Sequence, residues 1–206
     1  MKLLAALALM LAIPLRALAG DVVIDVRTPQ GAPVANAVVT VAAPHAGPIR
    51  FGWPYRMAQH NLQFDPFVLI VPVGADVTFP NLDTVRHHVY SFSAAKTFEL
   101  KLFGHDETRV VHFDKAGVVD LGCNIHDNMI AYIVVVDTPY AAQTNAAGEA
   151  VIRGVPAGAR GARVWHPYLR APGNAIALNL AVPAEGQVRQ AVAADLRAPP
   201  VMHRMY

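Results

Sequence analysis

Leu121-Gly-Cys-Asn-Ile-His-Asp-Asn-Met-Ile-Ala-Tyr-Ile-Val-Val135 is the stretch around which the rest of the chain is organised. It holds Cys123, the one cysteine in the sequence, with His126 and Met129 within six residues of it. A thiolate, an imidazole and a thioether on one short loop form most of the ligand set that redox-active copper selects, provided that a second histidine arrives from elsewhere. We therefore expect a metal site on this loop.

The second histidine is expected from the run Phe79-Pro-Asn-Leu-Asp-Thr-Val-Arg-His-His-Val-Tyr-Ser-Phe92, which contains His87 and His88. Neighbouring residues on a strand point to opposite faces of a sheet, so only one of the two can face the cysteine loop. Asn81 or Asn124 is expected to donate hydrogen bonds that hold the ligands in place.

The start of the chain predicts a signal peptide over residues 1–19. Met1-Lys2 precedes a short apolar run that ends at Ala17-Leu-Ala19, so we expect the mature protein to be exported. The formal net charge of +2 includes Lys2 and Arg16. Both residues belong to the predicted signal peptide, and the rest of the sequence has no basic stripe that would predict nucleic-acid binding. No later apolar run is long enough to span a membrane.

Short β-branched runs separated by Pro, Gly, Asn and Asp predict an all-β, antiparallel sandwich or barrel. The first two runs are predicted to pair as a hairpin, and one short helical turn is expected at most, around Ser93–Lys96. The expected strands include 21–27, 38–42, 68–71, 87–92, 98–102, 109–113, 118–121, 130–136 and 162–167.

The composition divides the chain into segments. Residues 20–50 and 138–196 resemble the two halves of a small transthyretin-like sandwich, the carboxypeptidase regulatory type, on patterns such as Gly31-Ala-Pro-Val-Ala-Asn-Ala-Val-Val39. The resemblance implies that the copper domain, 51–137, is inserted between these halves, and a linear arrangement of three pieces is the alternative. Residues 197–206 are expected to be a flexible tail.

The two motifs together resemble the cupredoxins, the blue copper proteins, in their plastocyanin-like and amicyanin-like forms. Phe79-x-Asn-x-Asp83 followed by His87-His-Val89 resembles the first ligand motif of that family, which implies that His87 is the ligand. His88 then stands where the family often has an asparagine. The resemblance extends to periplasmic plastocyanin-like proteins labelled methylamine utilisation proteins, so it implies a Greek-key β-sandwich and a periplasmic location.

The loop resembles the Cys-x-x-His-x-x-Met version of the family's second motif. This implies a single type 1 copper ion held by His87, Cys123 and His126, with Met129 as the axial ligand. It also implies electron transfer between redox partner proteins that dock on apolar residues near His126.

A catalytic function has no support in the sequence, so we expect that the protein is not an enzyme. There is no Gly-x-Ser-x-Gly elbow, no His-Glu-x-x-His and no phosphate-binding glycine loop. The single cysteine also excludes a binuclear copper centre with two bridging thiolates. Two alternatives to electron transfer stay open at this point: a copper-binding or carrier protein without a redox partner, and a metal-free structural domain.

Overall fold

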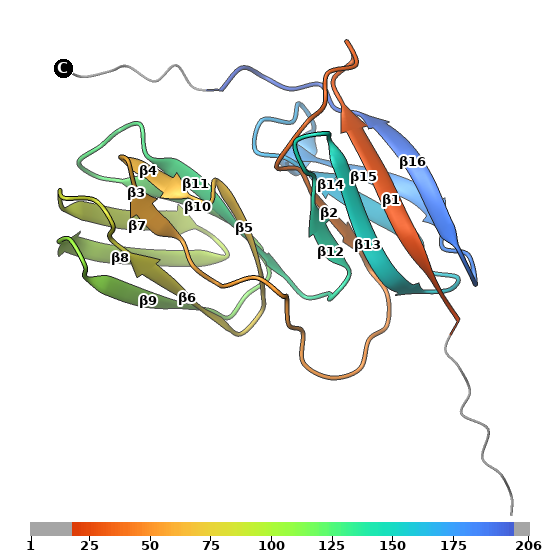
Figure 1. The fold of residues 1–206 in the computed structure, drawn as a ribbon, viewed down its shortest axis with the longest axis horizontal. Helices are drawn as coiled ribbons and strands as arrows, with labels where there is room; N and C mark the ends of the chain where they lie inside the picture. Colours follow the sequence, from red (N-terminus) through yellow and green to blue (C-terminus); the bar gives the residue numbers. More distant parts are fainter. Residues whose placement is uncertain (1–17, 200–206) are drawn as a thin grey trace, which may run out of the picture.

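The computed structural model describes residues 18–199, which form two β-sandwiches side by side (Figure 1). Within this range the one helical piece is the 3₁₀ turn η1 (Pro172–Asn174), so the all-β prediction is confirmed. None of these residues forms a helix with the length and apolar character that crossing a bilayer requires. Most of the predicted signal peptide (1–17) and the end of the predicted tail (200–206) lie outside the described residues.

The central unit is built from nine strands in two layers. A five-stranded sheet in the order β5-β11-β10-β7-β8 forms one layer, and the β6–β9 and β3–β4 pairs pack against it. The strands are β3 (Ala58–His60), β4 (Gln63–Asp65), β5 (Val68–Pro72), β6 (Ala75–Pro80), β7 (His87–Ser93), β8 (Lys96–Phe103), β9 (Thr108–Phe113), β10 (Gly117–Cys123) and β11 (Ile130–Val136).

The hydrophobic pattern of each strand follows from its place in the layers. In β6, Ala75, Val77 and Phe79 point into the core of the central unit, and the residues between them are more exposed. β5 is instead buried along its whole length. Leu69 and Val71 face the core of the central unit while Val68 and Ile70 face the other sandwich, so both faces of this strand are covered.

The terminal unit combines strands from both ends of the chain. Its sheets have the orders β13-β1-β16 and β12-β2-β14-β15, and its core lies between them. The strands are β1 (Ala19–Arg27), β2 (Val38–Val41), β12 (Ala141–Gln143), β13 (Glu149–Pro156), β14 (Arg160–Trp165), β15 (Ala175–Ala181) and β16 (Gln187–Ala193). In sequence, strands β3 to β11 therefore lie between β2 and β12, which are neighbours in one sheet of the terminal unit. The exact domain boundaries stay a prediction.

The predicted hairpin of the first two strands is wrong. β1 pairs with β13 and β16, whereas β2 pairs with β12 and β14. The apolar residues of both strands face one shared core from opposite layers. Alternation shows which face of a strand is buried but not which layer the strand joins. Likewise, Ser93–Lys96 closes the β7–β8 hairpin as a tight turn and is not helical.

An apolar seam joins the two units. Val68, Ile70 and Val134 of the central unit pack against Val38 and Trp165 of the terminal unit. The Trp165 ring meets the ring of Tyr132 edge-on, with 5.6 Å between the centroids. Because these side chains are buried only when the units are in contact, the seam holds the two sandwiches in one arrangement.

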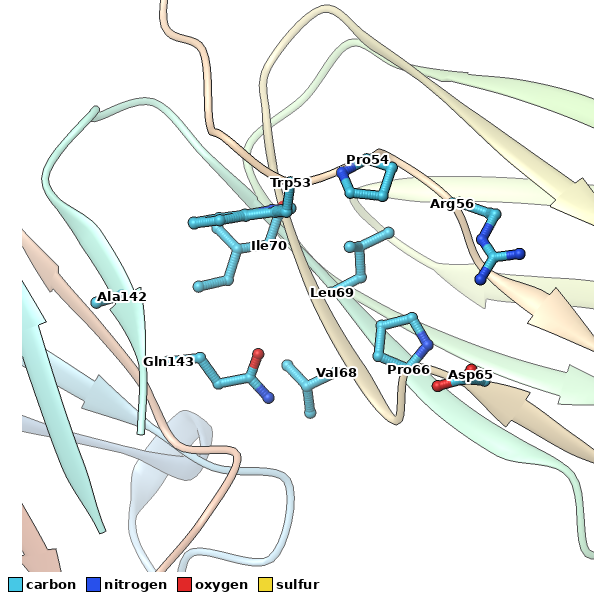
Figure 2. Close-up of a pocket in the computed structure, with 10 residues that line it drawn as sticks. All are labelled: Trp53, Pro54, Arg56, Asp65, Pro66, Val68, Leu69, Ile70, Ala142 and Gln143. Atoms are coloured by element: carbon cyan, nitrogen blue, oxygen red, sulfur yellow. The ribbon is translucent and has the colours of Figure 1, made fainter. Parts of the chain in front are cut away.

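A cavity of about 470 Å³ opens at the same seam, between edge strands β5 and β12 (Figure 2). Trp53 forms one wall: its indole N–H donates to the Ile70 carbonyl (2.8 Å) and its ring stacks on Phe51. Gln143 lines the cavity from the terminal unit. The segment that leads into the central unit is thus held against β5 by Trp53.

Arg197, the first residue of the predicted tail, is bound to the terminal unit. Its guanidinium donates to the Pro167 carbonyl (2.8 Å) and to Asn174 Oδ1 (2.9 Å), and its backbone N–H donates to the Tyr168 carbonyl. The fold of the terminal unit therefore extends as far as Arg197.

His166 is a buried histidine far from the cysteine loop in sequence. Its Nδ1 accepts a hydrogen bond from the Tyr168 backbone N–H (3.2 Å), and its ring packs against the Tyr168 ring. Burial lowers the pKa of this imidazole to about 4, against a weaker opposing effect of a hydrogen bond to the Ala35 backbone. His166 is therefore neutral in the folded protein at pH 7.

We expect His166 to destabilise the fold in acid. Since its folded pKa of about 4 lies below the unfolded value of about 6.5, the unfolded chain binds one more proton between these pH values. The free energy of unfolding should fall by about 3 kcal/mol from this group as pH drops from 6.5 to 4. Urea melts of the parent and His166→Gln should show a shallower pH dependence in the variant. The exposed His60→Gln should keep the parental dependence, and equal slopes in all three would contradict the prediction.

Candidate metal centre

The pairing of β7 with β10 brings His87 and Cys123 close together. Gly122 is registered with Tyr90 and Cys123 with Val89 in this antiparallel pair. Val89 and Cys123 both face the core, and His87 lies two residues before Val89 on the same face. His87 is 0% exposed, so the strand directs it inward beside the cysteine.

Three donor groups converge at the ends of these strands. The Cys123 sulfur lies 3.8 Å from Nδ1 of His87 and 3.8 Å from Nδ1 of His126. Their ligand atoms all lie within 4.8 Å of one another, and among residues 18–199 this is the one such group of His, Cys, Asp or Glu side chains. Ligands at about 2.0–2.3 Å from one ion and about 120° apart would be about 3.7 Å from each other. The arrangement therefore fits a single metal ion.

Met129 closes the cysteine loop. Its backbone N–H donates to the His126 carbonyl (3.0 Å), which makes a tight turn immediately before β11. The Met129 side chain is 1% exposed and belongs to the same buried cluster as Cys123. The thioether is thus buried in the apolar layer that holds the sulfur, and its role as axial ligand stays a prediction.

His88 points away from the group. Its Nε2 lies 2.9 Å from a carboxylate oxygen of Glu99 on the outer face of the sheet. Its backbone carbonyl accepts a hydrogen bond from the Asn124 N–H (3.0 Å). His88 and Asn124 therefore connect the two segments that carry the candidate ligands through the main chain, while of the adjacent histidines only His87 lies beside Cys123.

Asn81 shapes the loop that precedes His87. Its buried amide donates to the carbonyls of Val85 (2.8 Å) and Phe103 (3.1 Å), and its side-chain oxygen accepts from the Asp83 N–H (2.9 Å). These bonds fold residues 81–86 back on themselves. Asn81 therefore supports His87 through the loop and makes no contact with the donor atoms in the bonds described.

Asp83 is a functional candidate for which the motif Phe79-x-Asn-x-Asp83 alone predicts no role. Its carboxylate accepts a hydrogen bond from His87 Nε2 (2.8 Å) and from the backbone N–H groups of Asn61 (2.6 Å) and Leu62 (3.0 Å). Because Nε2 donates to Asp83, Nδ1 is the nitrogen that the neutral His87 ring leaves free for a metal ion, whereas in the metal-free protein the protonated ring can donate from Nδ1 to the sulfur. The spacing of four residues between Asp83 and His87 was the one sequence signal for their contact. The hydrogen bonds from Asn61 and Leu62 join remote segments, so the sequence does not predict them.

Cys123 and His87 shift each other's pKa. Burial acts to raise the pKa of the Cys123 thiol, but hydrogen bonds from His87, the main chain at His88 and Ile125, and His126 lower it to about 6. Burial likewise acts to lower the pKa of His87, yet its contacts with Cys123 and with the nearby carboxylate raise it. The sulfur is therefore mainly a thiolate at neutral pH, which is the form that binds metals.

Burial alone would raise the pKa of the Asp83 carboxyl group. The backbone N–H of Leu62, the His87 ring and the backbone N–H of Asn61 outweigh that effect and lower the pKa of Asp83. The carboxylate is thus ionised beside His87 at neutral pH.

The sequence matches no known family model, and no curated protein resembles it in sequence. Solved structures that match in part include a purple cupredoxin from Nitrosopumilus maritimus, with 22% identity and a TM-score of 0.36 over 39% of this chain and 98% of that one. A reduced amicyanin variant matches with 22% identity and a TM-score of 0.37, over 48% and 98% of the two chains.

A copper-containing nitrite reductase from Thermus scotoductus matches with 27% identity and a TM-score of 0.40, over 57% of this chain and 28% of the reductase. The partial structural neighbours therefore include two cupredoxins and one copper enzyme.

In the metal-free protein, we expect the Cys123 thiol to titrate with a midpoint of about pH 6. His87→Ala removes the strongest of the pKa-lowering hydrogen bonds, so the midpoint should move up toward the ordinary value of 9.0. His126→Ala should move it less, because its contribution is the weakest of the four. The ultraviolet absorbance of the thiolate as a function of pH measures each midpoint. A parental midpoint near 9 would contradict the prediction.

Proposed function

We propose that the chain is an exported mononuclear type 1 copper protein that carries single electrons between redox partners. The observation that carries the proposal is the convergence of His87, Cys123 and His126 within 4.8 Å. Copper bound there would alternate between Cu(I) and Cu(II) and so accept or release one electron. We assign this function to the central unit, residues 51–137, inserted in the sandwich formed by 20–50 and 138–196.

The residues present fit copper in chemistry as well as in spacing. One thiolate, two imidazoles and a buried thioether are the soft, mixed donors that blue copper sites use. The Asp83 carboxylate and the β7–β10 pairing hold His87 in one orientation, and the turn from His126 to Met129 fixes the loop. Ligands held in this way need little rearrangement when the charge of the site changes.

An apolar surface near His126 supports partner docking. Ile125, the residue before His126, is 46% exposed. Leu82, Val85 and Leu62 are also exposed, on the Asp83 loop and on the hairpin that this loop binds. These residues lie on segments joined by hydrogen bonds to the His87 side of the site, so a redox partner protein would meet apolar side chains there.

The colour of the copper-loaded protein tests the proposal. We expect strong absorption at about 600 nm from copper–thiolate charge transfer, and its complete loss in Cys123→Ser. His87→Gln should remove or strongly shift the band, because it deletes a nitrogen donor 3.8 Å from the sulfur. His88→Gln is the matched control: it changes the adjacent histidine, which faces Glu99, and should keep the band.

A colourless parent, or a band that survives Cys123→Ser, would refute the type 1 assignment. Voltammetry and self-exchange measurements then separate the two copper functions. Reversible one-electron reduction with fast exchange is expected for an electron carrier, whereas slow exchange with easy loss of copper would indicate a copper carrier instead.

Asp83→Asn should lower copper affinity by about 10–100-fold, because it removes the carboxylate that orients and polarises His87. Competition with a chelator measures the change. Asp106→Asn is the control, since that exposed carboxylate pairs with His105 and not with His87. Equal affinities in the parent and Asp83→Asn would show that the Asp83–His87 contact has no role in metal binding.

A further inference from the structure

A second cavity, of about 400 Å³, lies where the two units meet. Asp120 and Tyr132 line it from the central unit, and Trp165, Asn174 and Arg197 line it from the terminal unit. It shares no lining residue with the cavity between β5 and β12, and none of these residues belongs to the candidate metal centre. Junctions between structural units are common positions for small-ligand sites.

Asp120 supplies a negative charge on one wall of this cavity. Its backbone N–H donates to Ser93 Oγ (2.9 Å), which holds β10 against the end of β7. Its carboxylate, in contrast, has no hydrogen-bond or ion-pair partner among residues 18–199. The side chain is exposed at the cavity, yet partial burial raises the pKa of its carboxyl group and no nearby cation lowers it. An anion with reduced hydration and no partner favours a bound cation.

Arg197 supplies a positive charge from the other unit. Its Nη2 donates to the Pro167 carbonyl (2.8 Å) and to Asn174 Oδ1 (2.9 Å). The Asn174 amide also donates to the Pro167 carbonyl (2.9 Å), so the acceptors are themselves held in place. Both acceptors are neutral and leave the positive charge uncompensated, and Nη1 has no partner among residues 18–199. The guanidinium is therefore held in one orientation with donor groups left for a ligand.

Tyr132 lies close to both charges. Asp120 and Tyr132 are registered across β10 and β11. Burial has the largest effect on Tyr132 and raises its pKa to about 12, the charge of Asp120 also raises this pKa, and the charge of Arg197 lowers it. Asp120 and Arg197 nevertheless form no ion pair with each other. The cavity thus separates two opposite charges that act on one side chain and do not neutralise each other.

We propose that this cavity binds a small aminocarboxylate zwitterion, with its ammonium group at Asp120 and its carboxylate at Arg197. The Asp120 oxygens accept hydrogen bonds from the ammonium group, and Arg197 Nη1 donates to the carboxylate. The lining side chains carry one charge of each sign. A simple amine is therefore repelled by Arg197 and a simple carboxylate by Asp120, whereas a zwitterion is attracted at both ends. Binding there needs no metal, so the site is independent of the proposed copper function.

Binding is tested in the metal-free protein, because aminocarboxylates also chelate copper. The probes are glycine, β-alanine and γ-aminobutyrate, in which the two charges are progressively further apart. Trp165 lines this cavity, whereas Trp53, the other tryptophan of the sequence, lines the cavity between β5 and β12. At least one probe should shift the indole N–H signal of Trp165 in NMR spectra and leave that of Trp53 in place. No shift of the Trp165 signal by any of these probes would overturn the proposal.

The need for both charges is tested with the probe that binds most tightly. Ethylammonium and propionate each carry only one of its charges, so each should bind about tenfold more weakly or worse. Titrations followed at the Trp165 signal measure these affinities. An affinity of either compound equal to that of the zwitterion would overturn the assignment of the ligand class.

Two substitutions assign the charges to their residues. Asp120→Asn and Arg197→Gln should each weaken binding of the zwitterion by about tenfold or more, because each removes a charge-assisted hydrogen bond. Propionate should bind more tightly to Asp120→Asn than to the parent, since the repelling carboxylate is absent, and a loss of folding does not produce such a gain. Asp114→Asn and Arg170→Gln are the matched controls, because these residues form ion pairs but do not line the cavity. Parental affinity for the zwitterion in Asp120→Asn would overturn the site.

Discussion

The short pairing of β7 with β10 is the constraint on which the candidate site depends. Only two registered pairs, Tyr90 with Gly122 and Val89 with Cys123, join these strands at the site. These pairs place His87, the first residue of β7, beside Cys123, the last residue of β10. A shift of one residue would turn His87 outward and bring His88 in, so the register decides which histidine faces the sulfur.

The site is also held by a part of the chain that contributes no donor atom. The β3–β4 turn places Asn61 and Leu62 in left-handed conformations, which asparagine adopts readily and leucine rarely, and both donate their N–H groups to Asp83. Asp83 in turn accepts from His87. One carboxylate thus connects the β3–β4 hairpin to the imidazole of His87 through charge-assisted hydrogen bonds.

Much of the site could be predicted from the sequence because its strongest signals are local. Cys123, His126 and Met129 lie on one loop, and strand alternation reduces His87 and His88 to a choice of one. The all-β fold class could also be predicted, because short β-branched runs alternate with turn residues along the chain. What could not be predicted depends on contacts between remote segments. The layer that β2 joins is set by packing across a core, and the role of Asp83 is set by a hairpin that precedes it by some twenty residues.

The terminal unit has a consequence for the order in which the chain can acquire structure. β1 runs parallel to β16, with Asp21 registered to Gln187, so the first strand lacks one neighbour until nearly the entire polypeptide has emerged. The strands of the central unit, in contrast, all find their partners within residues 58–136. A growing chain can therefore complete the central sandwich while its own first strand is still unpaired, and β1 can gain its two neighbours only after β13 and β16 have emerged.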